Sequence, residues 1–260
     1  MHVLLDDPPP IFEDRLALRL LDPGAERAIR DHSDRFRTPA SRAIRCDVVV
    51  RSRYAEDRMA DAVRRGVRQY VILGAGLDTF AYRQPAWASD LRIVEVDHAA
   101  SQLDKGARLN RAGIGPPPNL RYAAADLEAD ALAPVLEAAG LDTTKPTFVA
   151  CLGVLIYLSE GAADAIFAMA AALAAGSEFV FTFSRPDAST ARPLSPGSAA
   201  AHVEAIGEPW RTRFDPDALA ARLKSAGFSS TLGFHRSTQH LDWCSVDREV
   251  GPWRTGTGQG

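Results

Sequence analysis

The sequence predicts an α/β protein whose sheet is mostly parallel and carries helices on both faces. Between residues 69 and 184, short runs rich in β-branched residues alternate with alanine-rich segments of helical periodicity. Strands that alternate with helices form parallel sheets, because a helix returns the chain to the same edge for the next strand. The first such strand ends in two glycines, in QYVILGAGLDT at 69–79, which predicts a nucleotide-binding turn.

Composition restricts the function classes. The chain of 260 residues is 46% hydrophobic and 24% charged, with a formal net charge of −3, which gives no general attraction to nucleic acid or anionic lipid. It contains no apolar run long enough to span a bilayer, and its acidic, proline-containing start is unlike a signal peptide. The three scattered cysteines include no Cys-x-x-Cys pair, so we expect free thiols, a cytoplasmic protein and no metal centre.

We expect residues 1–260 to form a single domain that begins with a helical cap over residues 1–65. Leucines in EDRLALRLL recur at helical spacing, and a Pro-Gly break separates this segment from the next periodic one. One or two further helices are predicted before Gly66, which acts as a C-terminal stop.

Residues 66–184 form the predicted cofactor-binding core. Right-handed crossovers place the carboxyl ends of its parallel strands along one edge, where ligands bind in such sheets. The predicted strands lie within 69–73, 91–97, 120–126, 146–158 and 178–184, and the predicted helices within 78–88, 99–113, 131–140 and 160–176.

The remainder of the chain is predicted to close the site and complete the core. Residues 185–214 are rich in Pro, Ser and Ala and read as a lid-like insertion. Residues 215–260 begin with a helix that Asp215 caps and Pro216 opens, and two closing strands follow.

The glycine turn favours a nucleoside without phosphates. In the dinucleotide fingerprint G-x-G-x-x-G, the third glycine lets a pyrophosphate rest on the following helix. Here Thr79 takes that position, and Asp78 places an anion where a phosphate would be repelled. Gly74 and Gly76 still allow close backbone approach, although a strand–turn–helix junction also needs glycine without any ligand. We therefore expect S-adenosylmethionine, with its cationic amino group and sulfonium, and disfavour an NAD-dependent oxidoreductase.

Acidic residues at the ends of the next two strands support the same interpretation. Glu95 and Asp97 lie about 20 residues after the glycines, the spacing at which an acid accepts hydrogen bonds from ribose hydroxyls. Asp126 follows the third strand, where an acid can accept from the adenine amino group. The alternative is that Asp97 and Asp126 cap the helices that follow them.

Three segments together, RQYVILGAGLDTFAYR, IVEVDHAASQLDKGARL and GVLIYL, resemble the leucine carboxyl methyltransferase family. The resemblance covers about 51–184, roughly half of the chain. This family includes bacterial O-methyltransferases of secondary metabolism. It implies a class I methyltransferase fold: a seven-stranded, mostly parallel, Rossmann-like sheet with an antiparallel final hairpin. N-terminal helices and an insertion after the fifth strand would cover the substrate.

The resemblance also implies roles for individual residues. Arg51 would clamp the methionyl carboxylate of the cofactor, although it could instead belong to a salt-bridged helix face. Gly74 would contact the cofactor through its backbone, Asp97 would hold the ribose, and Asp126 with Leu127 would flank the adenine. The expected cofactor-binding residues are Arg51, Gly74, Ala75, Gly76, Asp78, Glu95, Asp97, Asp126, Leu127 and Leu152.

One position departs from the family pattern. The family usually carries glutamate just before GVLIYL, whereas this chain has Leu152. Either the cofactor amino group finds another acceptor, or affinity falls, or methyl transfer is impaired. The expected function is O-methylation of a small-molecule carboxylate or hydroxyl. The alternative is an S-adenosylmethionine-binding protein that has lost turnover.

The need for a catalytic base depends on the acceptor. A carboxylate, with a reference pKa of about 4, is ionised at neutral pH, whereas a phenol near ~10 needs a base or an electrostatic helper. Tyr157 and His202 are the candidates for lining the methyl-transfer pocket, and a structural role is expected for His98.

Overall fold

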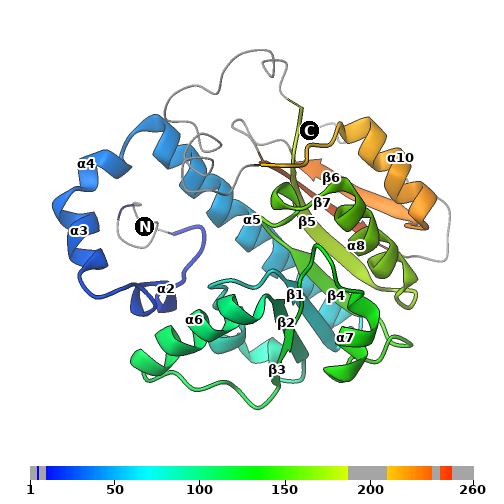
Figure 1. The fold of residues 1–260 in the computed structure, drawn as a ribbon, viewed down its shortest axis with the longest axis horizontal. Helices are drawn as coiled ribbons and strands as arrows, with labels where there is room; N and C mark the ends of the chain where they lie inside the picture. The colour runs from blue at the N-terminus through cyan, green and yellow to red at the C-terminus, as the bar shows by residue number, and fades with distance from the viewer. Residues whose placement is uncertain (1–4, 6–9, 187–209, 236–240, 248–260) are drawn as a thin grey trace.

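A sheet with the strand order β3-β2-β1-β4-β5-β7-β6 forms the centre of the computed structural model (Figure 1). The structure describes residues 5, 10–186, 210–235 and 241–247. The strands are β1 (Gln69–Leu73), β2 (Arg92–Asp97), β3 (Leu120–Ala124), β4 (Thr147–Cys151), β5 (Glu178–Ser184), β6 (Ser230–His235) and β7 (Leu241–Asp247).

The strands β1 to β5 are parallel, while β7 pairs antiparallel with both β5 and β6. Each of β1, β4 and β5 is buried along its whole length, which matches their mostly apolar sequences. After β1 the chain adds β2 and β3 on one side of β1, and then crosses over to add β4 and β5 on the other side. The strand order therefore reverses at β1. Such a switch point leaves a crevice at the carboxyl edge of a parallel sheet.

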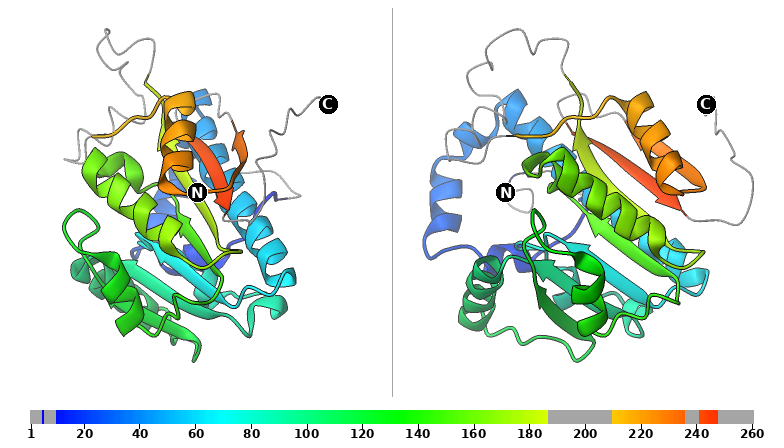
Figure 2. Two further views of the ribbon diagram at one scale, coloured as in Figure 1. Left: turned by 90° about the vertical axis from the view of Figure 1, so that its right-hand side faces the viewer. Right: turned by 45° about the vertical axis from the view of Figure 1, so that its right-hand side comes forward.

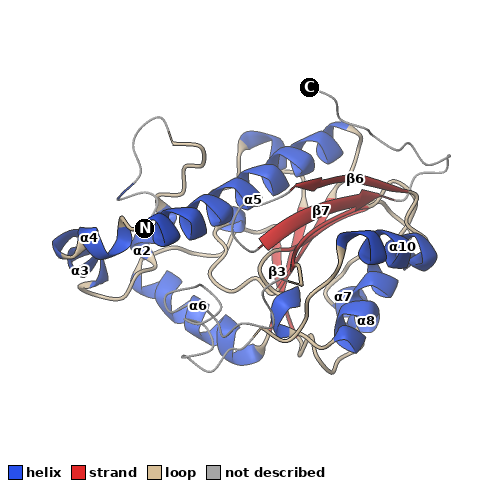
Figure 3. Cartoon of the chain, turned by 90° about the horizontal axis from the view of Figure 1, so that it is seen from above, coloured by secondary structure: helices blue, strands red, loops and turns tan. Residues whose placement is uncertain are grey.

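Helices cover both faces of the sheet, as predicted (Figure 3). Buried residues of α7 (Leu132–Ala138), α8 (Glu160–Ala172) and α10 (Pro216–Ala226) pack on one face, and Figure 2 shows α8 beside α10. The stripe of Ala55, Met59 and Ala62 on α5 (Pro39–Arg64) packs on the other. No helix within the described residues has the length and hydropathy needed to cross a bilayer.

Local sequence signals explain where several helices begin and end. Asp215 caps α10 by accepting from the amides of Asp217 and Ala218, and Pro216 is its first residue, which confirms that prediction. Residues 39–64 form one continuous helix, and Gly66 follows it with a φ of +100°.

The helix predicted within 78–88 is wrong. This segment contains two short 3₁₀ helices, η1 (Phe80–Tyr82) and η2 (Ala86–Ala88). Pro85 removes a backbone donor and disfavours helical backbone at Gln84. The Asp78 carboxylate accepts from the Phe80 amide at 2.7 Å. Such a local side-chain bond stabilises a short turn and competes with the backbone bonds of an α-helix.

The N-terminal helices α2 (Leu16–Arg19), α3 (Ala25–Asp31) and α4 (Ser33–Phe36) precede α5 and lie to its left in Figure 1. Their first part is attached to α6 (Ala99–Arg111). The Arg108 guanidinium donates to the Leu20 carbonyl at 3.1 Å and pairs with Asp22 at 3.2 Å. The start of this segment lies at the carboxyl edge of the sheet, where Asp14 accepts from the Thr79 hydroxyl at 2.6 Å.

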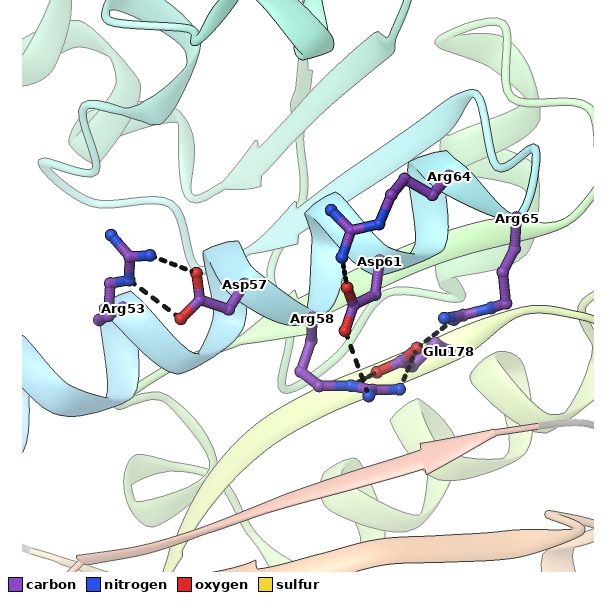
Figure 4. Close-up of polar contacts among 7 residues, drawn as sticks. All are labelled: Arg53, Asp57, Arg58, Asp61, Arg64, Arg65 and Glu178. Carbon is purple, nitrogen blue, oxygen red and sulfur yellow. Dashed lines mark hydrogen bonds and ion pairs between the residues drawn. The ribbon is translucent and has the colours of Figure 1, made fainter.

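A buried ion cluster holds α5 against the sheet (Figure 4). Glu178, the first residue of β5, has a side chain with no exposed surface. Its two carboxylate oxygens accept from Arg58 at 2.6 and 3.0 Å, and Arg65 contacts the second oxygen at 2.7 Å. Two arginines on one helix therefore neutralise a carboxylate that would otherwise be costly to bury.

We expect Glu178→Gln to lower the free energy of unfolding by about 3 kcal/mol, because it removes the buried anion of Arg58 and Arg65 and leaves Arg58 the longer 3.8 Å contact with Asp61. Asp57→Asn is the matched control, since Asp57 forms an exposed ion pair with Arg53 on the same helix. Its effect should stay below about 0.5 kcal/mol. Urea denaturation measures both, and equal losses would contradict a special role for the buried cluster.

Candidate cofactor site

A cavity of about 410 Å³ lies at the switch point of the sheet, between α5 and the turn after β1. The N-terminal segment contributes one wall through Phe12, Asp14 and Ala17. The cavity brings together six of the residues expected to bind cofactor: Arg51, Gly74, Ala75, Gly76, Asp78 and Leu152.

Both glycines of the turn have backbone that favours glycine. Gly74 has a φ of +64° and Gly76 a φ of +45°. A side chain at Gly74 would also place its Cβ 2.3 Å from Cγ2 of Val154, in the loop after β4. Gly74 is thus required by turn geometry and by packing between two loops, whether or not a ligand approaches it.

Asp97 connects the end of β2 to this turn. Its carboxylate accepts from the Gly76 amide at 2.5 Å and from the His98 amide at 2.7 Å. The cap of α6 is His98, whose Nδ1 accepts from the Ala100 amide at 3.3 Å. The structural role expected for His98 is confirmed, and the alternative of Asp97 as a helix cap is wrong.

Arg51 lies in the cavity wall with its guanidinium over the loop after β4. Its Nε is buried and has no hydrogen-bond partner among the described residues. Burial lowers the pKa of Arg51, while Asp47, Tyr157 and Asp78 act in the opposite direction. It is the neighbouring Arg53 that forms the i,i+4 surface pair, with Asp57, whereas Nε of Arg51 keeps a donor without a hydrogen-bond partner among the described residues.

Thr79 joins the N-terminal segment to the glycine turn, a role that the sequence did not reveal. Its hydroxyl donates to Asp14 at 2.6 Å and accepts from Nε of Arg83 at 2.9 Å. Arg83 also pairs with Glu56 of α5 and lies 4.6 Å from the ring centre of Phe12. The residue that replaces the third glycine is therefore the centre of a network that lines the cavity.

Glu95 does not line the cavity. Glu95 lies two residues before Asp97 in β2, and its side chain is buried. It forms an ion pair with Lys105 of α6, with 2.6 Å between Oε2 and Nζ. Burial raises the pKa of Glu95 to about 7, against the effect of Lys105. The structure thus gives Glu95 a core position and no contact with the crevice expected for ribose.

Asp126 and Leu127 lie beyond the end of β3, outside the cavity wall. The Asp126 carboxylate accepts from the Glu128 amide at 2.9 Å within a turn, and Leu127 packs against the core. Tyr157 lies in η3 (Leu155–Tyr157), close enough to Arg51 to influence its pKa. His202 falls outside the described residues.

A larger hollow of about 640 Å³ lies at the opposite, amino edge of the sheet. Arg92 there is hydrogen-bonded to the Gly140 carbonyl, and Arg121 donates to the carbonyls of Pro118 and Leu120. Its cations are thus already bonded to backbone, and the carboxyl-edge cavity is the better candidate.

The fold is an α/β sheet with a cavity at its switch point, which is where open α/β sheets bind ligands. The model of the family "Leucine carboxyl methyltransferase" matches residues 1–171, and the chain belongs to this family. The family resemblance read from the motifs is confirmed.

Relatives and solved structures agree with this assignment. A protein of Mycobacterium marinum named among the S-adenosyl-L-methionine-dependent methyltransferases is 39% identical over 54% of this chain and 46% of its own length. A Mycobacterium avium protein of the same name is 34% identical over 76% and 61%, respectively. The chain thus spans about half to three fifths of these relatives. Both relatives are named as S-adenosyl-L-methionine-dependent methyltransferases, and the cofactor in their names is the one expected from the sequence of this chain.

A crystal structure from Thermobifida fusca YX, assigned to the methyltransferases, covers 95% of this chain and 97% of its own, with 21% identity and a TM-score of 0.58. At this identity the likeness supports the fold: a five-stranded parallel sheet with flanking helices, as in methyltransferases.

The Glu95–Lys105 pair predicts a pH dependence of stability. A carboxyl whose pKa is raised from 4.5 to about 7 by folding binds more protons in the native state between these values. Its contribution therefore falls as pH rises through that window. Glu95→Gln should remove this slope in urea unfolding measured at several pH values. Glu137→Gln, on the exposed face of α7, is the control and should retain it; an unchanged slope in Glu95→Gln would contradict the prediction.

Proposed function

We propose that the protein is an S-adenosylmethionine-dependent O-methyltransferase acting on a small-molecule carboxylate or hydroxyl. The observation that carries the proposal is the buried, unpartnered Nε of Arg51 in a cavity that also contains Gly74 and Gly76. A planar guanidinium in this position suits bidentate binding of a carboxylate. The amino-acid end of the cofactor carries such a group.

The remaining residues fit the other parts of the cofactor. Asp78 lines the same cavity and is the acceptor for the amino group in the absence of a family glutamate at position 152. Asp97 uses its oxygens for two backbone amides, and a carboxylate has further lone pairs for ribose hydroxyls. Asp126 and Leu127 are assigned to the adenine on the open rim next to β3.

The charge of the cavity is complementary to the cofactor. Three carboxylates, from Asp14, Glu56 and Asp78, face two guanidiniums, from Arg51 and Arg83. The site therefore carries an excess of one negative charge. S-adenosylmethionine carries one carboxylate, one ammonium and one sulfonium, which gives it one excess positive charge.

The bound cofactor would supply an electrophilic methyl group on a sulfonium. The chain's own part is to hold the methionyl end with Arg51 and Asp78 and to exclude water from the cavity. Orientation of this kind can contribute ~7–11 kcal/mol to a displacement reaction. A carboxylate acceptor needs no base, and Tyr157 and His202 remain the candidates for assisting a hydroxyl acceptor. The lid-like insertion expected at 185–214 lies outside the described residues over 187–209, and its role as a cover of the acceptor stays a prediction.

The second candidate function is a binding protein with weak or no turnover. The observation that favours it is the position of Leu152 in the cavity wall, where the family carries an acid. A labelled-methyl assay across aromatic acids, phenols and cell extract separates the two functions, because only the enzyme transfers methyl groups to an acceptor.

Calorimetry tests the cofactor assignment. We expect S-adenosylmethionine and S-adenosylhomocysteine to bind and NAD not to bind. Arg51→Ala should weaken S-adenosylhomocysteine binding by roughly 10- to 100-fold, because a charge-assisted hydrogen-bond pair is lost. Arg53→Ala, at an exposed position on the same helix, is the control and should bind as the wild type does. Tight NAD binding without S-adenosylhomocysteine binding would refute the proposal.

Leu152→Glu should strengthen S-adenosylhomocysteine binding, because it returns an anionic acceptor for the amino group to the cavity wall. Leu152→Gln is the matched control of similar size without charge, and we expect a smaller gain from it. The calorimetric titration with S-adenosylhomocysteine measures the affinities of both variants. If Leu152→Glu binds no better than Leu152→Gln, the missing charge is not what distinguishes this site.

A further inference from the structure

The loop after β4 touches Arg51 directly at Gly153. Gly153 has a φ of +76°, a conformation that favours glycine. A Cβ at this position would lie 2.9 Å from Nη2 and 3.0 Å from Nη1 of Arg51. The guanidinium therefore occupies the space that any other residue at position 153 would fill with its side chain.

The conformation of Gly153 is itself fixed from the sheet. Its amide donates to Oγ1 of Thr182 at 2.6 Å, and Thr182 is fully buried in β5. The neighbour Val154 fills the space beside Gly74, so the loop is also held by the glycine turn. Gly153 is thus held by a side-chain hydrogen bond on one side and by packing on the other.

The contact with Gly153 matters for Arg51 because no hydrogen bond fixes its guanidinium at Nε. That atom is buried and has no partner among the described residues. A long side chain that is not fixed by hydrogen bonds keeps several rotamers, and ordering it on binding lowers affinity. A surface that fits the guanidinium plane before the ligand arrives reduces that cost.

We propose that Gly153 and Thr182 are positioning residues that orient the Arg51 fork for the carboxylate of the ligand. This inference rests on the proposed function, since it concerns how the same site recognises the amino-acid end of S-adenosylmethionine. Thr182 acts through the Gly153 amide, and Gly153 acts through contact with the guanidinium.

The test compares two ligands that differ only at the amino-acid end. S-adenosylhomocysteine carries the carboxylate, whereas 5′-methylthioadenosine keeps the adenosyl thioether and lacks the amino-acid portion. Thr182→Val removes the hydroxyl at nearly constant volume, and Thr182→Ser retains it. We expect Thr182→Val to weaken S-adenosylhomocysteine by about tenfold, the effect of losing one well-placed hydrogen bond, and to change 5′-methylthioadenosine by less than about twofold. Thr182→Ser should preserve the wild-type ratio of the two affinities.

Gly153→Ala is the second variant, because its Cβ would meet the guanidinium directly, in a loop whose positive φ it also strains. It should reduce the same affinity ratio, and in the Arg51→Ala background neither substitution should reduce it further. Melting temperatures show which variants fold. A general loss of structure would weaken both ligands alike and leave the ratio unchanged, which would overturn the inference.

The outcomes also separate this inference from the function on which it rests. If the wild type binds neither ligand, the proposed cofactor site is wrong and the inference falls with it. If the wild type prefers S-adenosylhomocysteine and Arg51→Ala abolishes that preference while Thr182→Val and Gly153→Ala retain it, the proposed function stands and the positioning role is refuted.

Discussion

The ion cluster at Glu178 fixes the position of α5 along the sheet, and the candidate site depends on that position. Arg58 lies seven residues after Arg51, which is about two helical turns and ~10 Å along the axis. The helix runs antiparallel to β1, so its last turns lie at the amino edge, where Glu178 begins β5. Holding Arg58 at that edge places Arg51 at the carboxyl edge, beside the glycine turn. A stability feature at one end of the sheet therefore determines the geometry of a binding site at the other.

Three loops from different parts of the sequence then interlock around Arg51. The turn after β1 makes room at Gly74 for Val154, the loop after β4 makes room at Gly153 for Arg51, and Asp97 at the end of β2 binds the Gly76 amide. Each contact uses either a missing side chain or a backbone amide, so small changes in any loop are transmitted to the others. These contacts are possible because β2 and β4 both lie next to β1, so that the loops after the three strands meet at the switch point.

The sequence predicted what depends on local pattern and missed what depends on packing. The buried parallel strands, the Asp215 cap and the stop at Gly66 follow from periodicity and residue preference, and the motif residues of the glycine turn do line one cavity. Asp14 and Glu56 could not be linked to Thr79 from spacing, because the network joins segments that only the folded chain brings together. Glu95 shares its face of β2 with Asp97 but lies two residues further from the rim, ~7 Å back, where Lys105 of α6 covers it. Spacing along the sequence does not show that Lys105 covers Glu95.

The leucine at position 152 has a consequence for how the cavity divides its charges. The Asp14, Glu56 and Arg83 side chains are bound to one another or to Thr79, so their hydrogen-bonding groups are engaged within the protein, and the three together keep one excess negative charge. Arg51 and Asp78 are then the charged pair of the wall left to face a ligand, and they influence each other electrostatically. A ligand with a carboxylate and an ammonium on one carbon matches such a pair of opposite charges. An acid at position 152 would give the ammonium a second acceptor, whereas leucine leaves Asp78 as its partner and keeps the wall beside Gly153 apolar. In the proposed function, recognition of the amino-acid end is therefore concentrated on two side chains, one from α5 and one from the turn after β1.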